Sequence, residues 1–441
     1  MKPRPYPAAG RARDSRRRPM RLTRRQLTGA LAALPLLPML GGCEERHADT
    51  LTIWAMGNEG ASLPALLNRL ALPADLPPVD VQPLPWSAAH EKLLTGFAGG
   101  SLPTIGQVGN SWIAEMAAIG AIAPLPASAT TLLDDQFAAV VETNRIGGTA
   151  WAVPWYVDTR LQFYRKDMFA RAGYAAPPLA WAEWKRALHR VKALAGPGNY
   201  AVLLPLNEFE QLLTIALSAS ARLLRDKGAR GAFSDPEFKA ALAFYKSLFD
   251  ERLAPIASAT QISNIWTEFA KGYFSIFTSG PWTIGDMKSR LDPAMQDKWA
   301  TAPNPGPGGI GSAAPGGSSL VVFASQADSA AAWDIVARLL APTAQLAFHR
   351  LTGNLPARRS VWRAAGLASD PIVAPFATQL DHATALPKVP EWERIVTEMQ
   401  VVAERMVRGH YSVDAAAHEI DRRADRLLEK RRWMLDRGRA L

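Results

Sequence analysis

Strand-like and helix-like patterns alternate along the chain after residue 50, and this alternation limits the folds that the chain can adopt. Three β-rich stretches are each followed by a helical pattern, the stretches being TLTIWAM (50–56), VDVQPLPW (79–86) and LPTIGQVGN (102–110). Gly99-Gly100 closes the second helical pattern, and Ser111 and Gly120 suit the cap and the end of the third. Such alternation is typical of a parallel sheet with crossover helices. We therefore predict an α/β fold.

Helical patterns are frequent in the rest of the chain. Pro236 stands at the first turn of the pattern SDPEFKAALAFYKSLFD (234–250), and a Pro/Gly-rich loop covers 302–317. From Glu391 onward the sequence is helical and increasingly basic, which is typical of a solvated helix face. Because a single core stops growing near ~250 residues, the length of 441 residues predicts two domains.

The positive charge of the chain is concentrated at its N-terminus. The formal net charge is +10, but residues 1–42 hold ten Lys/Arg and one acid, which leaves 40 bases and 39 acids in the remainder. This distribution predicts no nucleic-acid partner. The basic start is followed by an apolar run from Leu27 to Leu40, which is shorter than the ~20 residues of a membrane span. Residues 1–42 are therefore predicted to be a secretory signal peptide, and Met20 is an alternative start for it.

Two motifs in this leader predict how the protein is exported and held. Arg24-Arg25 resembles a twin-arginine export signal, and Leu40-Gly41-Gly42-Cys43 resembles the lipobox of bacterial lipoproteins. Cleavage before Cys43, lipidation of that residue and a short tether over 43–49 would leave the protein anchored outside the cytoplasm. A plain signal peptide is the alternative. Since Cys43 is the only cysteine, the mature chain has no internal disulfide.

Sequence motifs of common enzymes are missing or interrupted. Gly306, Gly308 and Gly311 spell G-x-G-x-x-G, but prolines interrupt the motif and no strand leads into it. The chain has no P-loop, no G-x-S-x-G and no H-E-x-x-H motif, and we predict no metal and no cofactor. A glycosidase with two carboxyl groups stays open, with Glu59, Asp158 and Glu208 as candidate acids.

The tryptophans point to a ligand site. Four of the fourteen follow a strand-to-loop transition, namely Trp86, Trp112, Trp155 and Trp282. In open α/β sheets such positions face the crevice beyond the strand ends. A flat ring can cover the apolar face of a sugar while neighbouring polar groups bond its hydroxyls. Core packing is the alternative, and it suits other positions better, namely Trp54, Trp181, Trp184, Trp266 and Trp333.

Six segments in a fixed order resemble the bacterial extracellular solute-binding proteins of ABC importers, in particular the maltose- and trehalose-binding group. They are TLTIW, GNSWIAEMAAIGAIAPL, GGTAWAVPWYVDTRLQFYRKDMFARAG, FAKGYFSIFTSGPW, GGSSLVVFA and TGNLPARRSVW. The resemblance implies the type II periplasmic-binding-protein fold, in which two α/β lobes close on a ligand by a hinge. It places one lobe at 50–157 and 317–353 and the other at 158–316 and 354–441, with crossings near VPWYVDTR and GGSSL.

The resemblance also implies a function and a set of ligand contacts. The protein is expected to be a monomer that captures an oligosaccharide or glycoside and delivers it to an ABC permease, without catalysis. A secreted glycan-active enzyme and a sugar sensor that has no transporter are the alternatives. Matching positions imply contacts from Asn58, Glu59, Asn110, Trp112, Trp155, Asp158, Asn207, Glu208, Trp282, Gly317, Ser318 and Arg358. Tyr156 is expected beside Trp155 where the chain passes between the lobes.

Overall fold

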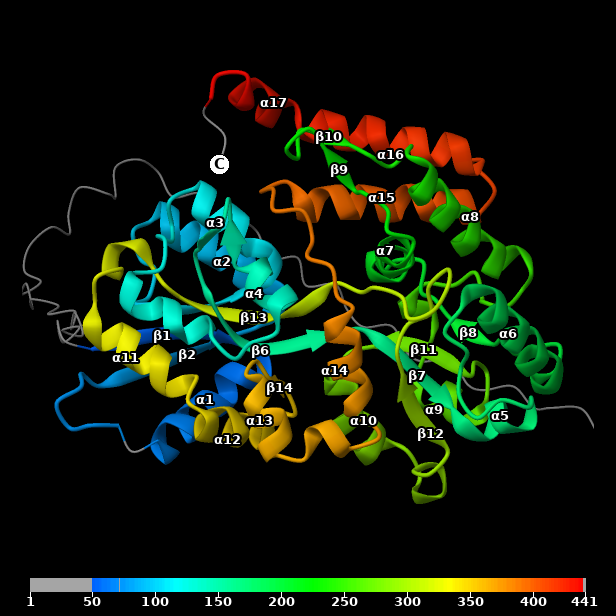
Figure 1. The fold of residues 1–441 in the computed structure, drawn as a ribbon, viewed down its shortest axis with the longest axis horizontal. Coiled ribbons are helices and arrows are strands. Elements are labelled where there is room, and N and C mark those ends of the chain that lie inside the picture. The colour runs from blue at the N-terminus through cyan, green and yellow to red at the C-terminus, as the bar shows by residue number, and fades with distance from the viewer. Residues whose placement is uncertain (1–49, 71, 439–441) are drawn as a thin grey trace, which may run out of the picture. The chain divides into compact units, whose positions relative to one another are not determined.

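The computed structural model describes residues 50–70 and 72–438 of the protein (Figure 1). The predicted signal peptide, Cys43 and the tether over 43–49 lie outside the described residues. Among the residues that the structure describes, no helix has the length and apolarity that crossing a membrane would require.

A six-stranded sheet forms the first half of the fold. Its strand order is β14-β6-β13-β3-β1-β2, with bounds β1 Leu51–Met56, β2 Val79–Leu84, β3 Ile105–Gly109, β6 Val153–Thr159, β13 Pro315–Val322 and β14 Leu355–Pro356. Strands β2 and β3 both pair with β1 in parallel, as the alternating sequence predicts. The other three strands are antiparallel to their neighbours. The mixed sheet therefore joins an N-terminal parallel part to strands from later in the chain.

A smaller sheet forms the second half. Its order is β12-β7-β11-β8, with bounds β7 Leu161–Arg165, β8 Val202–Leu203, β11 Ile276–Ser279 and β12 Trp299–Ala302. Two short hairpins stand apart, formed by β4 Arg145–Ile146 with β5 Thr149–Ala150, and by β9 Leu224–Arg225 with β10 Arg230–Gly231. Only Arg160 separates β6 of the first sheet from β7 of the second, so the chain crosses between the halves there.

Helices cover both faces of the first sheet (Figure 1). One face packs on α1 Gly57–Arg69, α11 Ala330–Leu339 and α12 Pro342–Thr352, and the other on α2 Trp86–Ala98 and α3 Ile113–Ala118. The short helix α4 Ala138–Thr143 lies against β6 and β13. Helix α3 begins at Ile113, and Ser111 makes no capping hydrogen bond, so the predicted Ser111 cap is wrong. A 3-10 turn over Asn110–Trp112 replaces that cap.

The second sheet is also covered on both faces. One core holds α5 Lys166–Arg171, α6 Trp181–Ala195, α7 Phe209–Ser218, α8 Pro236–Asp250, α15 Trp392–Val407 and α16 Val413–Leu427. The other holds α9 Ile265–Lys271, α10 Trp282–Arg290, α13 Arg359–Ala364 and α14 Ala374–Asp381. Helix α8 begins at Pro236 as predicted, and α17 Glu429–Leu435 follows α16. Two helix-covered sheets thus give the two-lobed α/β architecture.

The lobe boundary that the sequence placed at residue 354 is not where the sheets divide. Strand β14 pairs with β6, so Leu355 and Pro356 still belong to the first sheet. Similarly, β13 enters that sheet at Pro315 and β6 stays in it through Thr159. Such a short strand that contains proline has no recognisable alternating pattern, which explains the error.

Candidate ligand-binding cleft

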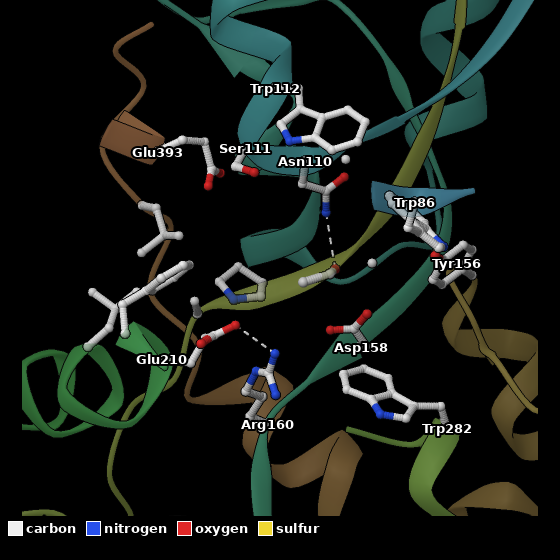
Figure 2. Close-up of a pocket in the computed structure, with 18 of the residues that line it drawn as sticks. Trp86, Asn110, Ser111, Trp112, Tyr156, Asp158, Arg160, Glu210, Trp282 and Glu393 are labelled. Carbon is white, nitrogen blue, oxygen red and sulfur yellow. Dashed lines mark hydrogen bonds and ion pairs between the residues drawn. The ribbon is translucent and has the colours of Figure 1, made fainter. Parts of the chain in front are cut away.

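A cavity of about 740 Å³ lies where the strand ends of the first sheet face the second half of the fold (Figure 2). Segments that follow β1, β2 and β3 line it from one side. The starts of α7, α10 and α15 line it from the other side. The volume lies within the usual 300–1,000 Å³ range of small-molecule sites.

Three tryptophan rings form the apolar walls. Trp86 and Trp282 are 39% and 41% exposed, which is unusual for such large side chains. Trp112 meets the edge of Trp86 with ring centroids 5.7 Å apart and an interplanar angle of 63°. The Arg160 guanidinium lies 5.4 Å from the centroid of Trp282. These rings therefore offer faces and edges to whatever occupies the cavity.

Two glycines leave the space that two of these rings occupy. A Cβ on Gly280 would lie 2.0 Å from the Trp282 ring. At Gly57 the backbone has φ +52°, and a Cβ would come within 2.8 Å of Trp86. The start of α1 can approach the Trp86 ring only because this position has no side chain.

Asp158 projects from β6 into the cavity (Figure 2). The pKa of its carboxyl is raised to about 6, mainly by burial, and the charge of Glu59 acts in the same direction. Arg160 and the backbone N–H of Gly317 act in the opposite direction. A Cβ at Gly316 would lie 2.1 Å from the Asp158 carboxylate, so only glycine fits beside it.

Glu59 lies at the cavity wall and contacts uncharged side chains. Asn354 donates a hydrogen bond from Nδ2 to Glu59 Oε1 at 2.7 Å. Tyr156 lies next to it, and burial, followed by the charges of Glu59 and Asp158, raises the pKa of its phenol well above the usual value. Gln107 donates from Nε2 to the Tyr156 hydroxyl at 3.5 Å. The phenol therefore stays protonated and can donate a hydrogen bond.

Two further polar groups are fixed by neighbours. Asn110 donates from Nδ2 to the Gly316 carbonyl at 3.1 Å and accepts from the Ser319 hydroxyl at 2.7 Å. Arg160 donates from Nη2 to Glu210 Oε1 at 2.7 Å, which Figure 2 shows as a dashed line. The cleft thus presents oriented donors and acceptors between its aromatic walls.

Seven of the residues predicted to contact a ligand line this cavity, and five do not. The seven are Asn58, Glu59, Asn110, Trp112, Asp158, Trp282 and Gly317. Trp155 is fully buried and stacks on Phe348 with ring centroids 4.4 Å apart, so its prediction as a ligand contact is wrong. Trp155 and Tyr156 lie side by side against Phe348 where the register between β6 and β13 shifts, and this packing keeps Trp155 out of the cavity lining.

The other four corrections have local causes. Asn207 accepts a hydrogen bond from the Ala259 N–H, and Glu208 accepts one from Gln211 at the start of α7. Ser318 is fully buried in β13. Arg358 binds the Leu340 carbonyl and lies 3.5 Å from Asp135. All four predicted contacts therefore serve the packing around the cleft.

The family resemblance did not identify several of the residues that line the cavity. Of these, Trp86 was expected at a crevice from its place after a strand, whereas Arg160, Glu210, Asn354 and Glu393 were not identified. Glu210 and Glu393 stand at helix starts far apart in the chain. No local pattern relates such positions before the halves are assembled. Among the described residues, no group of His, Cys, Asp and Glu could hold a metal ion.

Two α/β halves around one lined cleft define the class of two-lobed solute-binding proteins. A family model described as "bacterial extracellular solute-binding protein" matches residues 77–375. The chain belongs to this family.

Similar proteins match this chain over most of their length. The sugar-binding protein MalE of Xanthomonas citri is 45% identical, with a TM-score of 0.85 over 88% of this chain and 99% of that one. A putative binding protein of Brucella abortus is 23% identical over 93% of this chain and 100% of its own length. A diacetylchitobiose binding protein of Streptomyces coelicolor is 22% identical over 85% of this chain and 89% of its own length.

Proposed function

We propose that this protein captures a sugar, an oligosaccharide or a glycoside, in the cleft and delivers it to the permease of an ABC importer. The observation that carries the proposal is the pair of exposed rings, Trp86 and Trp282, on a cavity that also holds Asp158, Asn110 and Arg160. Rings cover the C–H faces of a sugar, and the polar groups bond its hydroxyls.

The named relatives support a sugar as the ligand. The Xanthomonas citri protein is described as sugar-binding, and a Pyrococcus abyssi relative that is 24% identical is named a maltotriose-binding protein. Binding requires no covalent step in this proposal. Closure of the two lobes follows if the ligand binds the closed arrangement more tightly than the open one.

Calorimetric titration with maltose, trehalose, maltotriose and diacetylchitobiose tests the proposal. We expect at least one of them to bind, and Trp282→Ala to weaken that binding by about tenfold or more through loss of stacking. Trp433→Ala is the matched control, because Trp433 is 49% exposed on α17 and does not line the cavity. Binding of an amino acid or peptide with no heat from any sugar would refute the proposal.

The enzyme alternative makes a different prediction for the same experiment. A glycosidase would hydrolyse the bound sugar, and substitution of Asp158 would abolish the rate. We propose binding without turnover, which chromatography of the recovered sugar after long incubation checks. Release of monosaccharides at a rate that scales with protein concentration would favour the enzyme.

We also propose export through the twin-arginine signal and a lipid anchor at Cys43, with the mature protein acting as a monomer outside the cytoplasm. The motifs around Arg24-Arg25 and before Cys43 support this proposal. Metabolic labelling with a fatty acid should mark the wild type and leave Cys43→Ser unlabelled. Equal labelling of both chains would contradict the anchor.

A further inference from the structure

The charged side chains that line the cleft are mostly acidic. Glu59, Asp158, Glu210 and Glu393 all line it, whereas Arg160 is the only basic side chain in its described lining. Figure 2 shows the carboxyl groups of Asp158, Glu210 and Glu393 around the same space. The lining therefore carries more negative than positive charge.

Two of the four carboxylates are bonded to side chains of the protein. Glu210 forms an ion pair with Arg160 at 2.7 Å. Glu59 accepts a hydrogen bond from Asn354 and is buried at the cavity wall. Their charges are therefore already stabilised by the fold.

Asp158 and Glu393 are the two carboxylates left to act on a ligand. The Arg160 guanidinium acts on Asp158 through its charge, but it is bonded to Glu210. Glu393 lies at the start of α15 and is half-buried, and its charge helps to raise the pKa of His90 on α2. The electric field of the Glu393 carboxylate therefore extends across the cleft, from the second half of the fold to the first.

We propose that the cleft sorts sugars by charge, admitting neutral and amine-bearing glycosides and rejecting those with a carboxylate or phosphate, with Asp158 and Glu393 as the specificity-determining residues. This inference rests on the proposed sugar-binding function. A ligand anion would be placed in a partly dehydrated space next to like charges, where repulsion is stronger than in water. An ammonium group would be attracted by both carboxylates and by the faces of Trp86 and Trp282.

Matched disaccharides that differ in one substituent test the proposal. Trehalose and maltose are each compared with the 6-amino-6-deoxy derivative and with the uronic acid that carries a carboxylate at the same carbon. Because the two substituents are similar in size, the amine-to-uronate affinity ratio isolates charge. We expect calorimetry at low salt to give a ratio of about tenfold or more, which falls at 0.5 M salt as screening increases.

Variants assign the effect to the two residues. Glu393→Gln and Asp158→Asn should each lower the amine-to-uronate ratio severalfold. Glu237→Gln makes the same charge change on the exposed surface of α8, outside the cavity lining, and should leave the ratio unchanged. Thermal melts verify that each variant is folded.

The outcomes separate this inference from the function on which it rests. Equal affinity for amine and uronate forms, or tighter binding of the uronate, overturns charge sorting and leaves sugar binding intact. If the amine-to-uronate affinity ratio is unchanged in both Glu393→Gln and Asp158→Asn, these two residues do not determine the specificity. Absence of binding by every sugar, neutral forms included, refutes the proposed function and this inference with it.

Discussion

Asp158 illustrates how a single residue can line the cavity at the expense of stability. Its carboxyl lies against Gly316, where no side chain could fit, and it is surrounded by protein that disfavours its charge. Because the pKa in the folded state is raised to about 6, the folded protein holds this proton more tightly than the unfolded chain does. Stability contributed by the protonated form is therefore lost as the pH rises from about 4 to about 6.

We expect Asp158→Asn to increase the free energy of unfolding above pH 7, because an amide carries no charge to desolvate. Conversion of the pKa shift gives at most about 3 kcal/mol, and partial exposure reduces the expected gain to about 1–2 kcal/mol. The gain should shrink as the pH falls from about 6 and disappear below about pH 3, where the carboxyl is protonated in both states. Urea unfolding of both proteins across this range measures it, and a gain that is independent of pH would contradict the argument.

At the scale of elements, β6 divides its side chains between core and cleft. Tyr156 and Asp158 line the cavity, whereas Trp155 packs on α12 through Phe348. Gln345 of α12 strengthens this contact by donating from Nε2 to the Trp155 carbonyl at 2.6 Å. Because the register of β6 with β13 shifts at Trp155, this ring and Tyr156 both lie against Phe348, and only Tyr156 also lines the cavity.

This division predicts the effect of Trp155→Ala. Removal of a fully buried indole should lower the free energy of unfolding by about 3–5 kcal/mol. Trp155→Phe keeps a ring against Phe348 and should cost less. Sugar affinity of the folded Trp155→Ala protein should change far less than that of Trp282→Ala. If Trp155→Ala kept normal stability and lost sugar affinity, Trp155 would be a ligand contact and not a core residue.

At the scale of the molecule, the cleft depends on two halves that the chain connects several times. The crossing at Arg160 also supplies a lining residue, and Gly317, with φ +98°, lies near a second crossing. Lys388, which precedes α15, forms an ion pair with Glu142 of α4 in the other half. Movement of the halves would therefore change both the cavity and this contact.

Ligand binding should make the protein more compact and more stable. At a sugar concentration of 100 Kd, binding adds about 2.7 kcal/mol to the free energy of unfolding. Small-angle scattering should show a smaller radius of gyration with ligand, and calorimetry a higher Tm. Trp282→Ala should require more sugar for both effects. A rise in Tm with an unchanged radius would indicate that the sugar binds without closure.

Sequence patterns determined the α/β class and the parallel pairing of β1, β2 and β3, because strand and helix periodicities are local properties. They also pointed to Trp112 and Trp282, since the ends of strands and their following loops can be found in the sequence, whereas Asp158 was implied by the family resemblance.

Tertiary structure alone decided which residues share the cleft. Trp155 and Asp158 stand on the same strand, yet one contacts Phe348 of α12 and the other faces Glu393 of α15 across the cavity. The pairing of Glu210 with Arg160 also joins residues distant in sequence. Burial and charge at a site are sums over neighbours in space, and only the assembled fold brings those neighbours together.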